Sequence, residues 1–172
     1  MIIVINGSLG VGKSTVMDAV LHTFEKGVAL DGDEIGYVHP FEIYDEQRIT
    51  YLYRTLTHLI YFHQRNGYRS FVINYVFESP ESLAELLAML GEIDDDVHAV
   101  WLTCDPDEQE ARIRKRGRDS LTWELSRFVE LRRIQAEAAK RGFIGVEIDT
   151  TGKSPEIIAE SIKQKIGAAK TL

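Results

Sequence analysis

The sequence predicts an α/β fold, a three-layer sandwich in which helices cover both faces of a five-stranded parallel sheet. Short apolar segments alternate with longer amphipathic ones along the 172 residues, which is the pattern of repeated strand–helix units. The first segment, Ile2–Ile5, is a continuous β-branched run, and such runs are typical of strands buried on both faces. A glycine-rich turn follows it. Length and a hydrophobic content of 44% suit a single domain, residues 1–172.

The remaining elements follow from helical spacing and from helix start signals. The first helix is expected at 14–26, where apolar residues recur at helical spacing before Gly27. Ser79-Pro80, Asp105-Pro106 and Ser154-Pro155 each place a capping residue before a proline at the first helical position. Further strands are expected at 28–30, 70–77, 97–103 and 144–148, and further helices at 45–66, 80–90, from 106 through 116, at 122–141 and at 155–166.

Composition excludes several classes of protein. A formal net charge of −7 argues against nucleic acid as a partner, because such binding needs clustered Lys and Arg. The single cysteine, Cys104, excludes an internal disulfide, and no Cys/His cluster has the spacing of a zinc site. The apolar start is too short for a signal peptide or a membrane span. We therefore expect a cytoplasmic protein without a membrane partner, either a monomer or a weak dimer.

The turn after the first strand carries a phosphate-binding motif. Residues 7–14 match G-x-x-x-x-G-K-[ST] between a strand and a helix, the context that this P-loop motif requires. Glycines allow backbone N–H groups to surround a phosphate, and the helix dipole favours an anion at the same place. Lys13 is expected to reach the β- and γ-phosphates, and the Ser14 hydroxyl to bind Mg²⁺. The predicted ATP contacts are Gly7, Ser8, Leu9, Gly10, Val11, Gly12, Lys13, Ser14 and Thr15.

Three further stretches accompany the P-loop: Asp31-Gly32-Asp33, the basic segment 112–118 and Asp149-Thr150-Thr151-Gly152-Lys153-Ser154-Pro155. With them, the whole chain resembles the small P-loop kinases that include shikimate kinase, gluconate kinase, chloramphenicol phosphotransferase and adenylate-kinase-like enzymes. The resemblance implies the P-loop NTPase fold with strand order 2-3-1-4-5 and a lid at about 112–122. It also implies transfer of the γ-phosphoryl group of ATP to a hydroxyl of a small acceptor.

Asp31 and Asp33 follow the second strand, at the sheet edge where ligands bind in open α/β folds. The resemblance implies that Asp33 acts as a base or orients the acceptor hydroxyl, and that Asp31 is an outer partner of Mg²⁺. In an extended segment the two side chains would point the same way, whereas in a turn they would diverge. The alternative is that Asp-Gly-Asp only makes a turn and caps a helix.

Five cations lie within seven residues of this acidic chain: Arg112, Arg114, Lys115, Arg116 and Arg118. Such a reversal of charge indicates an anionic ligand. Arg112 and Arg116 are four residues apart and share a helical face, so both could reach one triphosphate and are assigned to catalysis. The resemblance implies that Arg112 also lies against adenine. The alternative is a solvated helix end paired with Glu108 and Glu110.

The nucleotide base and the acceptor are less well defined. The resemblance places Gly152 and Pro155 beside adenine, although helix capping by Ser154 would also explain that segment. Aromatic residues gather between 34 and 53 and could line an acceptor pocket or pack beneath a loop. They are Tyr37, Phe41, Tyr44, Tyr51 and Tyr53, with His39 among them. Asn74, at the end of the third strand, is expected to face the same cleft.

The acceptor stays open because two family signatures are missing. The segment 74–77 reads Asn-Tyr-Val-Phe, without the Asp-Gly-Phe-Pro-Arg type of signature of nucleoside-monophosphate kinases or the Gly-Gly-Gly turn of shikimate kinase. A nucleoside or nucleotide kinase and an antibiotic phosphotransferase remain alternatives. So does an ATP-binding module that acts through a partner protein. A regulatory GTPase would explain Asp33-Glu34-Ile35-Gly36, but the guanine-binding Asn-Lys-x-Asp sequence is absent.

Overall fold

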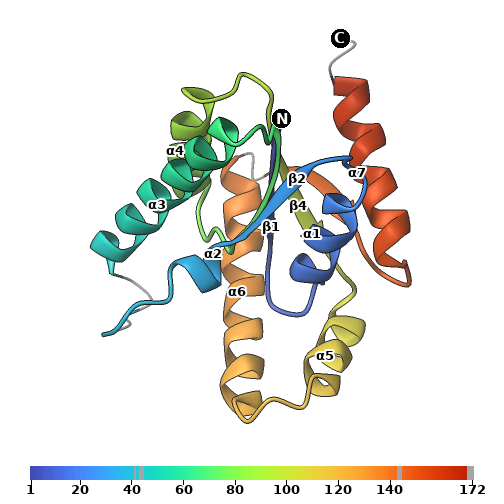
Figure 1. Ribbon diagram of the computed structural model, residues 1–172. Helices are drawn as coiled ribbons and strands as arrows, with labels where there is room; N and C mark the ends of the chain where they lie inside the picture. The colour runs from blue at the N-terminus through green and yellow to red at the C-terminus, as the bar shows by residue number, and fades with distance from the viewer. Residues whose placement is uncertain (41, 43–44, 143–144, 170–172) are drawn as a thin grey trace.

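The computed structural model describes residues 1–40, 42, 45–142 and 145–169 (Figure 1). Its five strands form one parallel sheet in the order β2-β3-β1-β4-β5. This confirms the predicted fold class and strand order. The strands are β1 (Ile2–Gly7), β2 (Gly27–Asp31), β3 (Ser70–Asn74), β4 (Val97–Thr103) and β5 (Val146–Asp149).

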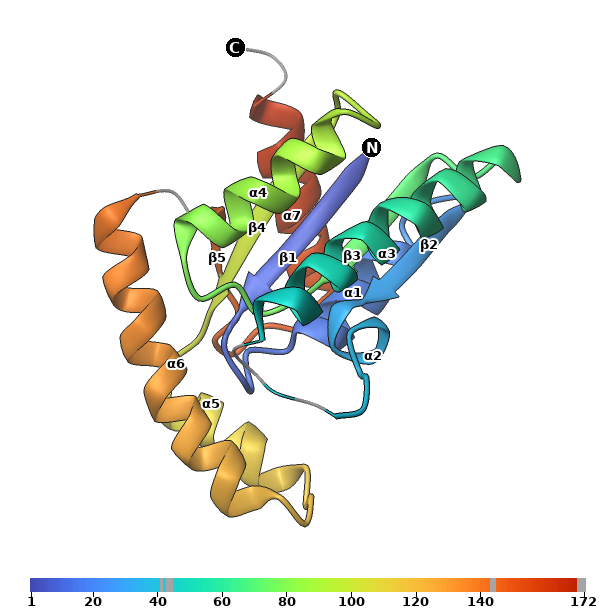
Figure 2. The ribbon, with the colours of Figure 1, turned by 90° about the vertical axis from the view of Figure 1, so that its left-hand side faces the viewer.

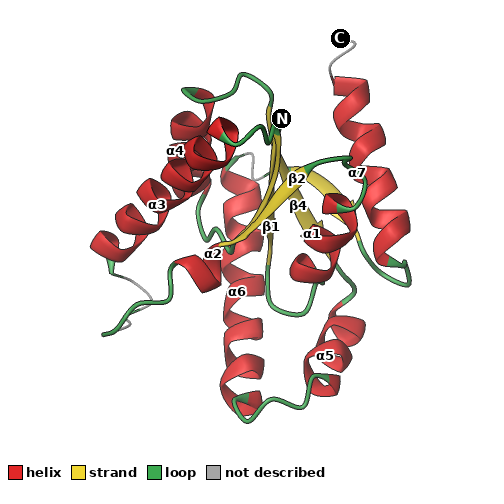
Figure 3. Ribbon diagram, viewed as in Figure 1, coloured by secondary structure: helices red, strands yellow, loops and turns green. Residues whose placement is uncertain are grey.

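Helices cover both faces of this sheet, as Figure 3 shows. They are α1 (Lys13–Leu21), α2 (Gly32–Ile35), α3 (Glu46–Arg65), α4 (Pro80–Gly91), α5 (Pro106–Lys115), α6 (Leu121–Arg141) and α7 (Pro155–Ala169). One apolar cluster joins the sheet to α3, α4 and α6, and a second joins it to α1 and α7. No helix in the described part of the chain is long and apolar enough to cross a membrane.

The central strand β1 explains why the site forms where it does. All six of its residues are buried, because β3 and β4 flank it and helices cover both of its faces. The register pairs Asp31 with Asn74 and Ile5 with Asn74. The carboxyl ends of β2, β3 and β1 therefore meet at one edge of the sheet. Helix α5 and the adjoining half of α6 project beyond this edge (Figures 1 and 2).

Several element ends differ from those predicted. Helix α1 ends at Leu21 rather than near residue 26, and just after it the Thr23 hydroxyl donates to the Val20 carbonyl (2.8 Å). Phe24 still packs, partly buried, against the core. Strand β5 spans Val146–Asp149 rather than 144–148, and residue 144 lies outside the described residues.

Strand β3 ends at Asn74 rather than at Phe77. The next residue, Tyr75, still donates its N–H to the Ile5 carbonyl (3.1 Å). The Phe77 N–H instead donates to the side chain of Asn6 (3.0 Å). A side chain thus replaces a backbone acceptor here, and the chain leaves the sheet beside the P-loop.

Candidate functional site

The P-loop forms the floor of a cleft at the carboxyl edge of the sheet. Gly10 and Gly12 have φ values of +81° and +97°, in the left-handed region that side chains disfavour. A Cβ on Gly10 would also lie 2.8 Å from the Gln109 carbonyl oxygen, so the turn has no room for one. No side chain of the described residues caps α1. Its first N–H groups are therefore available to an anion, as the motif predicts.

Lys13 begins α1 and is only 8% exposed. Its ammonium group donates to the Ser8 carbonyl across the P-loop (3.2 Å). Burial lowers the pKa of Lys13 to about 8; the carboxylates of Asp33 and Asp31 oppose this shift and the charge of Arg116 adds to it. A phosphate placed here would stabilise the charged form, because opposite charges at short range favour ionisation. Lys13 is thus poised to bind an anion.

Asp31 links the ends of β2 and β3 to the P-loop. One carboxylate oxygen, Oδ2, accepts from the Asn74 amide (2.9 Å) and lies 3.5 Å from the Ser14 hydroxyl. The other, Oδ1, accepts from the Asp33 N–H (2.9 Å) and caps α2. The capping alternative is therefore confirmed for Asp31. It does not compete with a functional role, because Oδ2 faces the P-loop.

The Ser14 and Asp31 oxygens fit a magnesium ion. Hard oxygen donors of this kind are what Mg²⁺ prefers, and it takes only one or two from the protein when phosphates supply the rest. Among the described residues, no three His, Cys, Asp or Glu side chains converge on a possible metal site. A site built from two protein oxygens and nucleotide phosphates agrees with that finding.

Asp33 lies within the turn of α2 and lines the same cleft. Burial raises the pKa of its carboxyl above the usual range, and the charge of Lys13 is the largest opposing influence. Asp31 raises the pKa further, whereas Arg48 and Arg118 lower it. A carboxylate with a raised pKa is a better proton acceptor than an exposed one. The geometry thus brings a potential base beside the phosphate-binding lysine.

Two hollows share the P-loop as a wall. The larger, about 730 Å³, is the cleft that holds Lys13, Asp31, Asp33 and Arg118. The smaller, about 300 Å³, is lined by Thr15, Arg112, Lys153 and Pro155 among others. Arg116 lines both hollows. Gly152 lines neither, and its N–H donates to Glu108 (3.0 Å).

Arg112 is fixed by protein groups. Its guanidinium donates to the Thr150 carbonyl (2.9 Å), the Thr150 hydroxyl (3.1 Å) and the Val11 carbonyl (3.3 Å). Thr150 is completely buried. The neighbouring Gln109, 2% exposed, donates to Ser8 and to the Leu9 carbonyl. Helix α5 is therefore tied to the P-loop and to the loop after β5.

The basic segment divides into two parts. Arg112 and Arg114 form ion pairs with Glu108 and Glu110, as the alternative interpretation expects. Arg116 and Arg118, beyond the end of α5, line the main cleft, where Arg118 also pairs with Glu124 (3.1 Å). The helix-end interpretation therefore holds for Arg112 and Arg114, whereas an anionic ligand of Arg116 and Arg118 stays a prediction.

The aromatic residues of the predicted acceptor region also separate. Tyr37 is 79% exposed and lines the main cleft beside Glu34. Tyr53 is fully buried, and its hydroxyl donates to the Ser82 carbonyl (3.0 Å). Tyr51 lies on the outer face of α3, beside Phe62 in another hollow. Phe41 and Tyr44 lie outside the described residues.

Sequence reasoning missed three polar residues near the site: Arg48, Gln109 and Glu124, all nine-tenths or more buried. Gln109 occurs in no motif. Thr150 lies in the predicted adenine-side segment 149–155, but its buried contacts were not predicted. Glu124 had a detectable signal, because it lies four residues before Phe128 on a helix face that is otherwise expected to be apolar.

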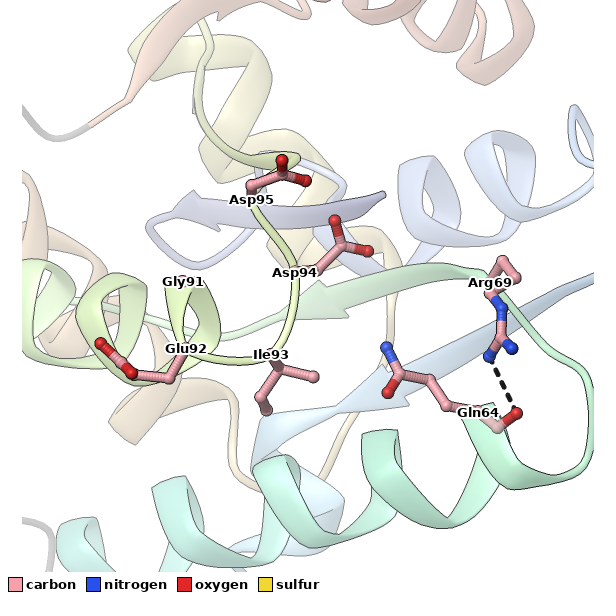
Figure 4. Close-up of a pocket in the computed structure, with 7 residues that line it drawn as sticks. All are labelled: Gln64, Arg69, Gly91, Glu92, Ile93, Asp94 and Asp95. Atoms are coloured by element: carbon pink, nitrogen blue, oxygen red, sulfur yellow. Dashed lines mark hydrogen bonds between the residues drawn. The ribbon is translucent and has the colours of Figure 1, made fainter.

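A separate hollow of about 590 Å³ lies at the opposite, amino edge of the sheet (Figure 4). Arg69 there donates to the Gln64 carbonyl (2.9 Å), and Asp94 pairs with the N-terminal ammonium group (2.7 Å). Ligands of open α/β sheets bind at the carboxyl ends of strands. This hollow is therefore set apart from the candidate site.

Comparison with known proteins places this geometry in a family. A family model described as an AAA domain matches residues 2–143, which include the P-loop, Asp31, Asp33 and the basic segment. The chain belongs to the AAA-domain family. None of the curated proteins shows significant sequence similarity to this chain.

Solved structures show the fold of this AAA-domain chain in other proteins. A gluconokinase from Sinorhizobium meliloti 1021 superposes with a TM-score of 0.69 at 15% identity, over 97% of this chain and 91% of its own. The tunicamycin resistance protein of Deinococcus radiodurans superposes with a TM-score of 0.66 at 20% identity, over 96% of this chain and 95% of its own. Shikimate kinase from Acinetobacter baumannii, in complex with shikimate, superposes with a TM-score of 0.65 at 18% identity, over 98% of this chain and 94% of its own. The fold is that of the small P-loop kinases, as the sequence resemblance implied.

Proposed function

We propose that this chain is an ATP-dependent kinase that transfers the γ-phosphoryl group to a hydroxyl of a small acceptor. The observation that carries the proposal is the shared position of Lys13 and Asp33. A buried phosphate-binding lysine and a carboxyl with a raised pKa interact within one cleft. A nucleotide-binding module would need only the lysine, whereas phosphoryl transfer to an alcohol also needs a group that receives the hydroxyl proton.

The donor is held by the P-loop in this proposal. Backbone N–H groups of 7–15 and the ammonium of Lys13 bind the β- and γ-phosphates, while Ser14 and Asp31 hold the magnesium ion. The bound ion neutralises phosphate charge. The adenine side is the smaller hollow, where Thr15, Arg112 and Pro155 form the wall, with Gly152 in the loop before them.

The acceptor is oriented by Asp33. The acceptor's hydroxyl oxygen forms a bond to the γ-phosphorus. The bond from that phosphorus to the oxygen of the β-phosphate breaks at the same time, and ADP leaves. The hydroxyl proton passes to Asp33. Arg116, which lines both hollows, and Arg118 offset the negative charge that spreads over the transferring group. We assign catalysis to Lys13, Asp33 and Arg116, with Arg112 fixing the base of the arginine segment.

The acceptor class is the open part of the proposal. The gluconokinase and shikimate kinase among the similar structures point to sugar acids and hydroxy acids, and the tunicamycin resistance protein points to antibiotics. Exposed Tyr37 at the cleft would also suit the ring of a nucleoside. Each class carries the hydroxyl that Asp33 requires.

The test is a panel of sugars, sugar acids, hydroxy acids, nucleosides, nucleotides and antibiotics, incubated with Mg²⁺ and ATP or GTP. Mass spectrometry would identify any acceptor that gains one phosphate. We expect one acceptor class to react with ATP, and we expect Asp33→Asn to lower the rate of product formation by about 10²-fold. Tight nucleotide binding with no phosphorylated acceptor would contradict the proposal and favour a module that works through a partner protein.

A further inference from the structure

The inner face of α6 carries a carboxylate where an apolar side chain is expected. Phe128, Leu131 and Ala138 on this face are buried in the core, as are the polar side chains of Arg127 and Gln135, and Glu124 lies one turn before Phe128. Glu124 is 2% exposed. An ionised carboxylate is costly to bury unless other groups compensate its charge. Its retention at a core-facing position therefore calls for a functional explanation.

The contacts of Glu124 point toward the cleft. One oxygen, Oε1, accepts from the guanidinium of Arg118 at 3.1 Å. The other, Oε2, is buried and has no hydrogen-bond partner among the described residues. Glu124 itself does not line the cleft, whereas Arg116 and Arg118 do. Any effect of Glu124 on a ligand must therefore pass through those two arginines.

Electrostatics connect Glu124 to the second arginine as well. Burial and the nearby charge of Arg118 both lower the pKa of Arg116, and the charge of Glu124 opposes them. The two guanidinium groups repel each other, and Lys13 lies close enough to Arg116 to feel its charge. A buried anion behind them offsets this repulsion and lets both cations face one ligand.

We infer that Glu124 is a positioning residue that holds Arg118 on one carboxylate oxygen and receives Arg116 on the other when a γ-phosphate occupies the cleft. The inference rests on the proposed kinase function. It gives the basic segment an anchor on α6, so that Arg118 is preorganised before the ligand binds and Arg116 has a partner to meet.

The first test separates positioning from stability. In Glu124→Leu an apolar side chain of similar volume replaces the buried charge, and the partner Arg118, 61% exposed, can still be solvated. The substitution thus removes a buried carboxylate without leaving Arg118 as a buried unpaired cation. We expect an unchanged or higher Tm together with a kcat lower by about 10- to 100-fold, because the arginines lose their anchor. The matched control is Glu137→Leu, since Glu137 is an exposed residue of the same helix, paired with Lys140. It should leave kcat unchanged.

The second test needs no acceptor. Trp123 precedes Glu124 and is 53% exposed, so its fluorescence in a Trp101→Phe background reports on this segment. Titration with Mg²⁺ and either ADP or a non-hydrolysable ATP analogue measures how much the γ-phosphate adds to affinity. We expect Glu124→Leu to reduce the ratio of the affinity for the ATP analogue to the affinity for ADP by at least about threefold. The ratio should approach that of the Arg116→Ala/Arg118→Ala double variant. Adding Glu124→Leu to that double variant should cause no further loss.

The outcomes separate the two proposals. If the wild type phosphorylates no acceptor, the kinase proposal fails, while the nucleotide preference still tests Glu124. If Glu124→Leu lowers Tm but keeps both kcat and the preference for the ATP analogue, Glu124 is only structural and the inference is wrong. Losses that add to those of the arginine double variant would also overturn it, because Glu124 would then act by another route.

Discussion

The donor side and the acceptor side of the cleft are built differently. On the donor side, Gln109 and Arg112 tie α5 to the P-loop, and buried Thr150 joins the loop after β5 to both. On the acceptor side, Asp33 and Glu34 lie in the short helix α2 and Tyr37 lies just after it, and all three line the cleft. The proposed nucleotide site is thus preorganised by long-range contacts, whereas the proposed acceptor wall depends on a short local segment. Donor variants should therefore have larger effects than acceptor variants.

The largest expected effect is on the donor side. Lys13→Ala should lower phosphoryl transfer by about 10³-fold, since it removes the charge closest to the transferring group. The fold should survive, because the motif's glycines and β1 remain. Steady-state kinetics and thermal melting would measure the two effects. The control is Lys163→Ala on the exposed face of α7. Near-normal turnover in the Lys13 variant would remove the main support for a rigid donor site.

Asp33→Asn tests whether the acceptor side contributes chemistry. We expect kcat to fall by about 10²-fold while the Kd for nucleotide, measured by calorimetry, stays the same. In the wild type, kcat should fall as pH drops through the pKa of Asp33, which burial raises above the ordinary value of an aspartate. That acid limb should be missing from the variant. Parallel loss of nucleotide affinity would instead assign Asp33 to the metal site, with Asp31.

The pH dependence of nucleotide binding would sharpen the donor side. Only the ammonium form of Lys13 attracts phosphate, and burial lowers its pKa to about 8. Affinity should thus be retained below that value and lost as pH rises through it, by about tenfold between about pH 7 and about pH 9. Lys13→Arg is the control, because arginine stays charged across this range. A sloping profile in that variant would show that another group titrates.

The smallest expected effect concerns Tyr37. Because it is 79% exposed in the cleft wall, Tyr37→Ala should raise the KM of the acceptor by only about threefold, the loss of a partly solvated aromatic contact. The KM for ATP should not change. Tyr51→Ala, on the outer face of α3, is the matched control. A change in both KM values would indicate that the two sides of the cleft are coupled.

Sequence reasoning succeeded where the relevant residues are contiguous. The run Ile2–Ile5 indicated a buried strand. The P-loop motif located the turn together with Lys13 and Ser14 in the single short segment 7–15. Its errors concern the ends of elements, where side chains form hydrogen bonds that a sequence pattern does not show. The Thr23 hydroxyl donates to the Val20 carbonyl just after α1, and the Asn6 side chain accepts from the Phe77 N–H after β3. For Asp31 the capping interpretation is confirmed, and the magnesium role stays a prediction that the second carboxylate oxygen leaves room for.

By itself, the sequence determined the alternating strand–helix order, the position of the phosphate-binding turn and the resemblance from which the strand order followed. These are properties of short segments, set by side-chain periodicity and backbone conformation. Only the tertiary structure decided which residues of the basic segment face the cleft. It also brought Gln109 to Ser8 and Thr150 to Val11, and buried Glu124 behind the basic segment. The first two contacts join residues 101 and 139 positions apart, and helix packing rather than local pattern sets which face of a helix meets them.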